Sequence, residues 1–369
     1  MMKINFKMYT NKIYILIMFK LVSLIGLTLS IIPHRRKYIV FIGHHGRFNG
    51  NSKYLYSALS DKMNALISAP NNMKIIFIVK SGMENIDKNS LKNILFKVSS
   101  KRDWLQYFLY LWFAKALVIT TPGYDWKSRR VFAFKAKTIL VSNGIPLKSP
   151  GILSKNFDSI KSIKYTSFWS DIDQLWVSSQ FERYMASSSL EYPIEKIFIN
   201  GAARQTIFAR ENFNNNKSQA KEKIKHILGD VITGKRIVLV ALTHRDYMKD
   251  ANFGAFDSIE KLYGYNSTDF IEYLVQNKIH LVIRDHALGK SKKYEKYEKI
   301  SSYIGHEILP ELNDIILAFD VIITDYSGLY LDLLKLDIQL GLLRFPTDKF
   351  VKERGLILPD KVLSGPLVI

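Results

Sequence analysis

The sequence predicts an α/β protein made of two domains, each built on a parallel β-sheet. Short apolar runs that indicate buried strands recur at intervals long enough to hold a helix, which is typical of parallel sheets. A polar and charged stretch between Asn212 and Asp230 interrupts this series, and a second series follows it. At 369 residues the chain is long enough to bury two separate cores.

The amino-terminal segment, residues 1–37, contains the apolar stretch Ile13–Ile32, about the length of a membrane span. Lys20 interrupts this stretch and basic residues flank it on both sides, so the positive-inside rule gives no orientation. The absence of a small-residue cleavage pattern argues against a removed signal peptide. We expect a helix that lies in the membrane interface with its cations on anionic headgroups. The alternatives are a transmembrane anchor and a helix packed in the protein core.

The first domain is expected over residues 38–212 and the second over residues 235–369, joined by a linker at 213–234. The expected strands of the first domain are Tyr38–Gly43, Lys74–Val79, Ala116–Thr120, Lys137–Val141, Gln174–Val177 and Ile197–Asn200. Those of the second are Arg236–Ala241, His280–Ile283, Glu307–Leu309, Val321–Ile323 and Gln339–Leu343. Two facing Rossmann-like domains make the GT-B architecture, in which a nucleotide-linked donor lies mainly on the second domain.

Composition and charge narrow the function classes. Lys and Arg outnumber Asp and Glu by 53 to 33, and the net charge of +20 suits an anionic membrane, a phosphate-rich substrate or nucleic acid. We find no nucleic-acid-binding signature, so we expect no nucleic-acid partner; a lysine-rich proteome is the simplest alternative explanation of the charge. The lack of cysteine excludes disulfides and thiolate chemistry and fits a cytoplasmic protein. No cluster has metal-ligand spacing, so we expect neither a protein-held metal nor a cofactor; the alternative is a divalent ion that binds together with a nucleotide.

The most informative stretch lies near the carboxyl end of the chain. The apolar run Val321–Ile323 is followed by Thr324-Asp325-Tyr326-Ser327-Gly328, which turns directly into an apolar-periodic helix. In a parallel sheet such a turn lies at the carboxyl end of a strand, where ligands collect. Free N–H groups at the helix start, with the hydroxyls of Thr324 and Ser327, would make a phosphate site. The alternative is that Ser327 only N-caps a structural helix.

Several spaced motifs resemble the CDP-glycerol glycerophosphotransferases, the enzymes that build teichoic acids and related poly(alditol phosphate) chains. The carboxyl-terminal part resembles the signature of this family at Ile323–Ser327, Asp332, Leu336–Ile338, Pro346–Asp348 and Glu353–Gly355. Further segments that resemble the family lie at residues 41–56, 144–148, 241–246 and 281–286. The matches span about residues 38–367.

The resemblance implies transfer of glycerol phosphate from CDP-glycerol, or of another alditol phosphate from a CDP-alditol, to an acceptor hydroxyl with release of CMP. It implies a peripheral enzyme at the cytoplasmic face of the cell membrane, in teichoic-acid-like or capsular polymer synthesis. The membrane segment and the basic first domain suggest a lipid-linked anionic glycan or polymer as acceptor. Two alternatives are a GT-B glycosyltransferase that uses a nucleotide sugar and a catalytically degenerate, membrane-bound family member.

This chemistry needs cations and N–H donors around a diphosphate and a base for the attacking hydroxyl. Arg245 and Arg284, each just after a second-domain strand, are candidates for bidentate phosphate contacts. His286 at the same edge is the leading candidate for acid–base catalysis or phosphate contact. The other predicted substrate-binding residues lie in the motifs: Lys148, Asp246, Thr324, Asp325, Ser327 and Asp332. Asp325 and Asp332 would either accept hydrogen bonds from ribose or alditol hydroxyls or stabilise a helix start.

Two departures from the family pattern affect these expectations. Where the family has His-Gly-Thr-Pro-Leu-Lys, Asn143 replaces the candidate base, and an amide cannot take a proton near neutral pH. We expect His44 or His45, on a loop of the first domain, to substitute; the alternative is a loop histidine without a catalytic role. The chain stops at Ile369, where family members continue with a helical tail, so we expect a truncated carboxyl-terminal domain.

Overall fold

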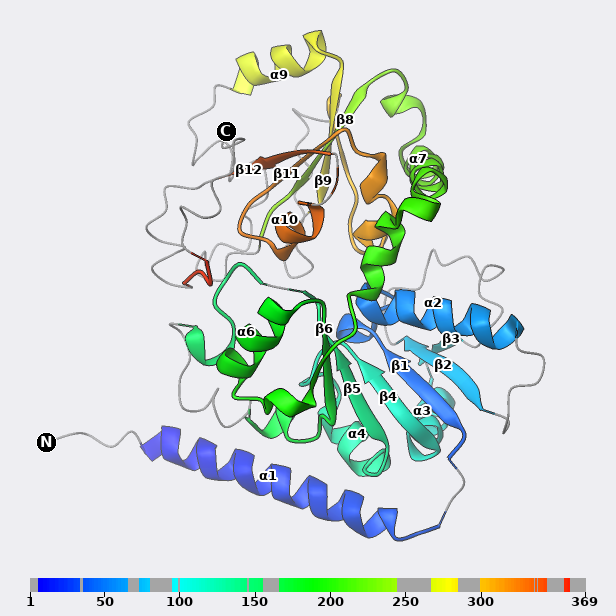
Figure 1. Cartoon of the computed structure of the whole chain (residues 1–369), viewed down its shortest axis with the longest axis vertical. Coiled ribbons are helices and arrows are strands. Elements are labelled where there is room, and N and C mark those ends of the chain that lie inside the picture. Colours follow the sequence, from blue (N-terminus) through cyan, green and yellow to red (C-terminus); the bar gives the residue numbers. More distant parts are fainter. Residues whose placement is uncertain are drawn as a thin grey trace, which may run out of the picture. The chain divides into compact units, whose positions relative to one another are not determined.

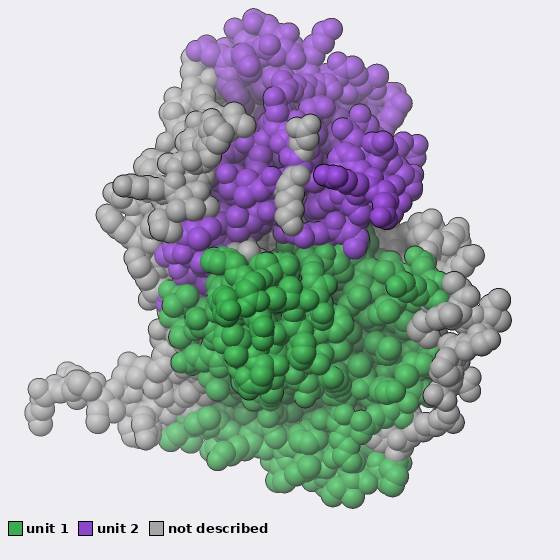
Figure 2. All heavy atoms as spheres, viewed as in Figure 1, with its two compact units in different colours: residues 1–144, 151–153, 157–204 green, residues 145–150, 154–156, 205–369 purple. Residues whose placement is uncertain are grey.

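The computed structural model describes residues 6–33, 36–65, 73–79, 95–98, 100–144, 146–154, 166–243, 267–284, 299–334, 336, 338–343 and 355–358. The chain divides into two compact units, each with its own parallel sheet (Figure 1). Unit 1 consists of residues 1–144, 151–153 and 157–204, and unit 2 of residues 145–150, 154–156 and 205–369; they are coloured separately in Figure 2. The predicted α/β fold with two parallel sheets is confirmed.

Unit 1 is built on a seven-stranded sheet with the order β3-β2-β1-β4-β5-β6-β7, in which every pairing is parallel. The strands are β1 (Tyr38–Ile42), β2 (Lys74–Val79), β3 (Leu95–Lys97), β4 (Ala114–Ile119), β5 (Lys137–Val141), β6 (Gln174–Val177) and β7 (Ile197–Ile199). The central strands are nearly continuous apolar runs because helices cover both faces of a parallel sheet. All six strands predicted for this unit are present, and β3 is an additional one.

Helices connect these strands, and Ser100 and Ser179 each cap the start of one. They are α2 (Gly50–Ala65), α3 (Lys101–Trp112), α4 (Trp126–Phe132) and α6 (Gln180–Leu190), with 3₁₀ turns η1 (His44–Gly46), η2 (Gly151–Leu153) and η3 (Ile194–Lys196). Ser100 and Asp103 form a capping box at the start of α3, where each side chain accepts a hydrogen bond from the backbone N–H of the other. Such caps satisfy N–H groups that the first helical turn leaves without partners.

The amino-terminal helix α1 (Phe6–Ser30) packs on α4 through one narrow face. The Phe19 ring stacks on Trp126 with centroids 3.9 Å apart, and Arg130 Nε donates to Ser23 Oγ at 2.6 Å. A β-carbon at Gly26 would lie 2.1 Å from the Arg130 carbonyl oxygen, so this close approach requires glycine. The stretch Ile13–Ser30 is long and apolar enough to cross a membrane, yet only 22% of it is buried. The helix therefore docks on unit 1 and leaves most of its apolar surface exposed.

Unit 2 contains a five-stranded parallel sheet with the order β10-β9-β8-β11-β12. Its strands are β8 (Arg236–Ala241), β9 (Ile279–Arg284), β10 (Ser301–Tyr303), β11 (Val321–Thr324) and β12 (Gln339–Leu342). The strand predicted at Glu307–Leu309 is wrong, because these residues lie in and just after a turn in which Leu309 N donates to the Gly305 carbonyl. Leu309 is buried in the core without belonging to a strand, which explains the misleading apolar signal.

The residues expected to form a linker, 213–234, instead form α7 (Phe213–Leu228) and η6 (Gly229–Ile232) of unit 2. Ala220 and Ile224 on α7 are buried in the same core cluster as Ile316 of η9 (Ile316–Ala318). The polar composition is that of a helix with one narrow buried face. The remaining elements among the described residues between 203 and 333 are η4 (Ala203–Phe208), η5 (Arg210–Asn212), α9 (Ser267–Gln276), η8 (Leu312–Asp314) and α10 (Gly328–Leu333).

A buried histidine lies in the sheet of unit 2. His280 of β9 is fully buried, and its Nε2 lies 2.8 Å from Ser302 Oγ. Burial, assisted by the charge of Lys235, lowers the pKa of His280 to about 4 from its ordinary value of 6.5. The folded chain thus holds a neutral imidazole in a place where the charged form is unfavourable.

We expect His280 to make the free energy of unfolding depend on pH. The unfolded chain protonates this residue near pH 6.5 and the folded chain only near pH 4, so its contribution is intact above pH 6.5 and falls between these values. The slope should reach at most about 1.4 kcal/mol per pH unit. Urea unfolding at several pH values between 4.5 and 7 measures the free energy of unfolding. Its change with pH should be smaller for His280→Gln, which keeps a polar partner for Ser302 but does not titrate. Equal slopes for the two proteins would contradict this prediction.

Candidate functional site

The predicted histidines of unit 1 lie in η1, directly after β1. The His44 backbone N–H donates to Asn49 Oδ1 at 3.0 Å, and His44 Nδ1 lies 2.8 Å from Thr121 Oγ1, just beyond the end of β4. When Nδ1 donates to the Thr121 hydroxyl, Nε2 carries the lone pair that can take a proton. His45 is exposed and adopts a left-handed backbone conformation, with φ 52°, and its ring centroid lies 4.1 Å from that of His44. Of the two, His44 is the one whose ring is oriented by a hydrogen bond to a described residue.

Asn143 follows β5 and lies beside the first residue of α2. Its side chain is exposed, and a β-carbon placed on Gly50 would lie 3.5 Å from Asn143 Oδ1 and 4.0 Å from Thr120 Cγ2. The Asn143 carbonyl accepts a hydrogen bond from Arg204 Nη2. The structure therefore brings Asn143, the end of β4 and the start of α2 together at the carboxyl edge of the sheet.

Two polar side chains that the sequence did not single out brace this edge. Asn51 is 2% exposed; its Nδ2 donates to the Ser142 carbonyl and its Oδ1 accepts from the Arg204 backbone N–H at 2.8 Å. Glu182 is 1% exposed and accepts hydrogen bonds from the Ser142 hydroxyl and from Ser178, whose backbone N–H lies 2.7 Å away. Ser142 Oγ in turn accepts from Gly144 N at 3.0 Å. These contacts fix the loop that presents Asn143.

The spacing of Ser179 and Glu182 resembles a capping box, and this was the only local signal for Glu182. Ser179 does cap α6, since its Oγ accepts from Glu182 N at 3.1 Å. The Glu182 carboxylate, however, bonds to Ser142 and Ser178. The contact with Ser142 joins residues 40 positions apart, which no local pattern reveals.

In unit 2, Thr324 and Asp325 are fully buried at the carboxyl end of β11. Thr324 Oγ1 donates to the Ala241 carbonyl of β8 at 2.7 Å, and Asp325 Oδ1 accepts from Thr243 N at 2.7 Å. Both side chains therefore tie β11 to β8. The geometry gives them a positioning role, in place of the direct substrate contact expected from the sequence.

Ser327 is half-buried and N-caps α10, because its Oγ accepts a hydrogen bond from Leu329 N at 3.3 Å. Ser327 therefore caps this helix, and its contact with a phosphate stays a prediction. Asp332 on the same helix is half-buried and accepts from Gln205 Nε2 at 3.4 Å. Of the residues in the Thr324–Ser327 motif, Ser327 alone is not fully buried.

The segment around Lys148 belongs to unit 2 although it follows the strands of unit 1 in the sequence. Leu147 is fully buried against Tyr326 and Tyr330. Lys148 forms an antiparallel bridge with Leu356, and Ser149 N donates to the Gly355 carbonyl at 3.1 Å. Gly355 has φ 75°, and a β-carbon there would lie 2.8 Å from Ser149 Oγ. Gly355, the last residue of the Glu-Arg-Gly motif, therefore lies beside the Pro-Leu-Lys motif.

Arg284, at the end of β9, is 4% exposed and clamps the chain that follows β10. Its Nη1 donates to the carbonyls of Ile304 and Gly305 at 3.0 and 2.8 Å, and its Nη2 lies 3.0 Å from His306 Nδ1. The guanidinium is thus engaged with protein atoms, which does not fit the predicted bidentate phosphate contact.

Three predicted site residues lie outside the described residues: Arg245, Asp246 and His286. In the sequence, Arg245 and Asp246 come two and three residues after Thr243, and His286 comes two residues after the end of β9. Within the described part of the chain, no group of three or more His, Asp or Glu side chains is arranged to hold a metal ion.

Comparison with known proteins gives a consistent picture. The sequence matches the family described as CDP-glycerol:poly(glycerophosphate) glycerophosphotransferase over residues 26–368. It is similar to a teichoic acid glycerol-phosphate transferase of Staphylococcus aureus (strain NCTC 8325 / PS 47), with 25% identity covering 92% of this chain and 82% of the relative. A structure of the wall teichoic acid polymerase TagF has a TM-score of 0.67 at 20% identity, covering 100% of this chain and 86% of TagF. A TagF variant soaked with CDPG has a TM-score of 0.69 at 18% identity, covering 99% and 86%. The structural likeness concerns the fold.

We expect Arg284→Lys to lower stability more than it alters substrate affinity. A lysine cannot reproduce the fork that reaches two carbonyls and His306, so the free energy of unfolding should fall by about 2 kcal/mol or more. Thermal unfolding measures this change, and Arg210→Lys, the same substitution at an exposed site of the same unit, provides the matched control. Unchanged stability together with a raised KM for a nucleotide donor would return Arg284 to the phosphate-binding role.

Proposed function

Because the chain belongs to the CDP-glycerol:poly(glycerophosphate) glycerophosphotransferase family, we propose that it transfers glycerol phosphate from CDP-glycerol to a hydroxyl of a lipid-linked teichoic-acid-like acceptor. The acceptor oxygen bonds to the β-phosphorus of the donor. The bond from this phosphorus to the bridging oxygen breaks, the hydroxyl proton passes to a base, and CMP leaves.

The convergence of family-like motifs in unit 2 is the observation that supports this proposal best. Leu147 packs on Tyr326, Lys148 pairs with Leu356, and Asp325 holds Thr243. These motifs are far apart in the sequence, and they meet at the carboxyl edge of a parallel sheet, where ligands of α/β proteins bind. Such a gathering fits a donor site on the second unit.

Within this donor site the residues divide into two groups. Lys148 and the Ser327 hydroxyl are suited to contact the diphosphate, with Arg245 and His286 as further cationic or acid–base contacts. Asp246 and Asp332 are suited to accept hydrogen bonds from ribose or glycerol hydroxyls. Arg284, Thr324 and Asp325 position the segments that carry these groups.

The base for the acceptor hydroxyl comes from unit 1 in this proposal. His44, oriented through Nδ1 by Thr121, takes the proton on Nε2. Asn143, at the same edge of the sheet, offers a hydrogen bond to the acceptor in place of the histidine that the family pattern has there. His45 has no required part. The proposal includes the GT-B architecture, with the acceptor on the first unit and the donor on the second.

The membrane brings the acceptor to the enzyme. The exposed face of α1 carries large apolar side chains such as Leu16, Ile17 and Leu24, which are 44 to 60% exposed. Lys20 is exposed on the same helix and can snorkel to the headgroups. These features support a helix that lies in the interface at the cytoplasmic face of the membrane.

The proposed reaction is tested by CMP release from CDP-glycerol by the purified protein in detergent. We expect release that depends on a membrane-lipid acceptor extract and that UDP-sugars do not support. CMP release from CDP-ribitol but not from CDP-glycerol would show that the transferred alditol phosphate is ribitol phosphate. Failure to bind CDP-glycerol in calorimetry, with a folded protein, would overturn the donor assignment.

We expect His44→Ala to lower kcat about 100-fold or more, because the acceptor loses its base. Thr121→Val should lower kcat by a smaller factor of about ten, because it frees the imidazole to change tautomer. His45→Ala, one residue away, is the matched control and should retain activity. Loss of activity in His45→Ala alone would move the base to that residue.

A further inference from the structure

Unit 1 contains a polar cavity at the amino end of β5, and therefore at the opposite edge of the sheet from His44. Its volume is about 420 Å³, which falls within the range of about 300–1,000 Å³ typical of small-molecule sites. The charged residues that line it are Arg129, Arg130, Lys135, Lys137, Asp171 and Asp173. None of these residues belongs to the proposed transfer site.

Positive charge predominates in this cavity, with four basic and two acidic side chains. Asp173 Oδ2 is already engaged, because it accepts a hydrogen bond from Thr138 N at 2.7 Å. Arg130 is held in place by Ser23 of α1 through Nε and by Ser170 Oγ through Nη1 at 3.0 Å. Lys135 and Lys137 are exposed at the rim. The cavity therefore suits an anion.

The inner wall carries a buried donor and a buried acceptor. Arg129 is 2% exposed and donates through Nε and Nη2 to the carbonyls of Tyr124 and Pro122. Its Nη1 lies 3.6 Å from Asp171 Oδ2, too far for a hydrogen bond. Among the described residues, neither Arg129 Nη1 nor Asp171 Oδ1 has a hydrogen-bond partner. Unsatisfied groups of this kind are rare in native proteins, and a ligand with hydroxyl groups could satisfy both.

Burial raises the pKa of the Asp171 carboxyl, against the opposing effect of Arg129. Burial also disfavours the charged form of Arg129 and therefore lowers its pKa, although the charge of Asp171 opposes this change. The two groups thus only partly compensate each other. A hydroxyl between them, donating to one and accepting from the other, would relieve both.

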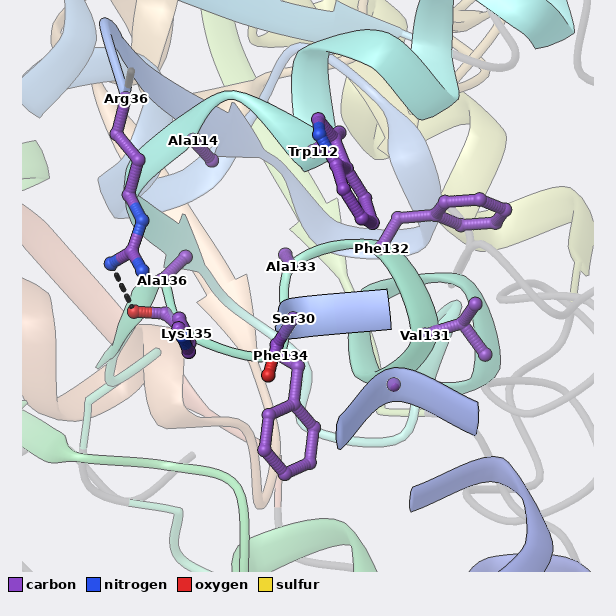
Figure 3. A pocket seen from close by; sticks show the side chains of 11 residues that line it. Ser30, Arg36, Trp112, Ala114, Val131, Phe132, Ala133, Phe134, Lys135 and Ala136 are labelled. Atoms are coloured by element: carbon purple, nitrogen blue, oxygen red, sulfur yellow. Dashed lines mark hydrogen bonds between the residues drawn. The ribbon is translucent and has the colours of Figure 1, made fainter. Parts of the chain in front are cut away.

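The cavity adjoins the helix that faces the membrane. A small neighbouring cavity of about 10 Å³ lies against Gly26 and Ser30 of α1 and shares Phe134 and Lys135 with the larger one (Figure 3). Arg36 Nη1 donates to the Lys135 carbonyl at 2.8 Å and closes this corner. A lipid beside α1 would therefore have its headgroup close to the larger cavity.

We propose that the larger cavity binds a phosphate that carries neighbouring hydroxyl groups, as the headgroup of phosphatidylglycerol does. Arg130, Lys135 and Lys137 contact the phosphate oxygens, and the Arg129–Asp171 pair contacts the hydroxyls. The site is separate from the transfer reaction and fixes how unit 1 sits on an anionic membrane.

The test is cosedimentation with phosphatidylcholine vesicles that contain equal fractions of either phosphatidylglycerol or phosphatidylserine. Both lipids carry one net negative charge, so a preference between them reports headgroup recognition, not bulk electrostatics. The cavity variants are Lys135→Ala with Lys137→Ala, and Ser170→Trp, which fills the cavity without a change of charge. The control is Lys62→Ala with Lys196→Ala, two exposed lysines of unit 1 outside the cavity.

We expect the wild type and the control to prefer phosphatidylglycerol by about fivefold and both cavity variants to lose this preference. CMP release in detergent should be unchanged in all of them, which separates this site from the transfer site. Millimolar sn-glycerol 3-phosphate should compete with the vesicles.

If the cavity binds a soluble phosphate with hydroxyl groups instead of a lipid headgroup, the results will differ. In that case sn-glycerol 3-phosphate would raise the thermal unfolding temperature of the wild type but not of the cavity variants, without any lipid preference. The proposal is overturned if the wild type shows neither response, or if both cavity variants keep the lipid preference while remaining folded.

Discussion

The architecture of unit 2 depends on two buried side chains that tie β11 to β8. A parallel ladder ends with backbone groups that no longer have strand partners. Thr324 and Asp325 extend the pairing past that point, with hydrogen bonds to the Ala241 carbonyl and the Thr243 N–H. The same two bonds therefore fix where two loops leave the sheet. Ser327 follows one of them, so its position depends on this join.

Strands were predictable from the sequence wherever they formed continuous apolar runs, and less so elsewhere. β3 and β10 have only three residues each, and Ser301–Tyr303 has no apolar run at all. Helix α7 was mistaken for a linker because only a narrow face is buried, through Ala220 and Ile224. The placement of residues 145–150 in unit 2 depends on contacts between Leu147 and Tyr326, which are distant in the sequence. Local patterns contain no information about such contacts.

In the candidate site, the sequence predicts which residue types lie at the ends of the strands but not the direction in which their side chains point. Polar residues at the ends of strands were correctly located, since parallel strands end at one edge. Arg284, Thr324 and Asp325 nevertheless turn inward and bond to protein atoms. A buried polar group and a ligand-binding group are chosen for the same hydrogen-bonding capacity, so sequence alone does not separate them. The partner of His44, Thr121, lies 77 positions away and was equally out of reach.

Net charge and hydrogen bonding contribute differently to anion binding by this enzyme: charge attracts anions, and hydrogen bonds discriminate between them. A net charge of +20 attracts any polyanion, whether a membrane, a nucleotide donor or a polymer of glycerol phosphate. Such attraction is screened by salt and does not distinguish one phosphate from another. Discrimination needs groups with fixed directions and little access to water, because only there does an unmatched partner leave a donor or an acceptor unpaired. In unit 1 the Arg129–Asp171 pair has this character, whereas Lys135 and Lys137 at the rim do not. Long-range attraction and short-range selection are thus assigned to different residues of one surface, and a change of salt should affect the first far more than the second.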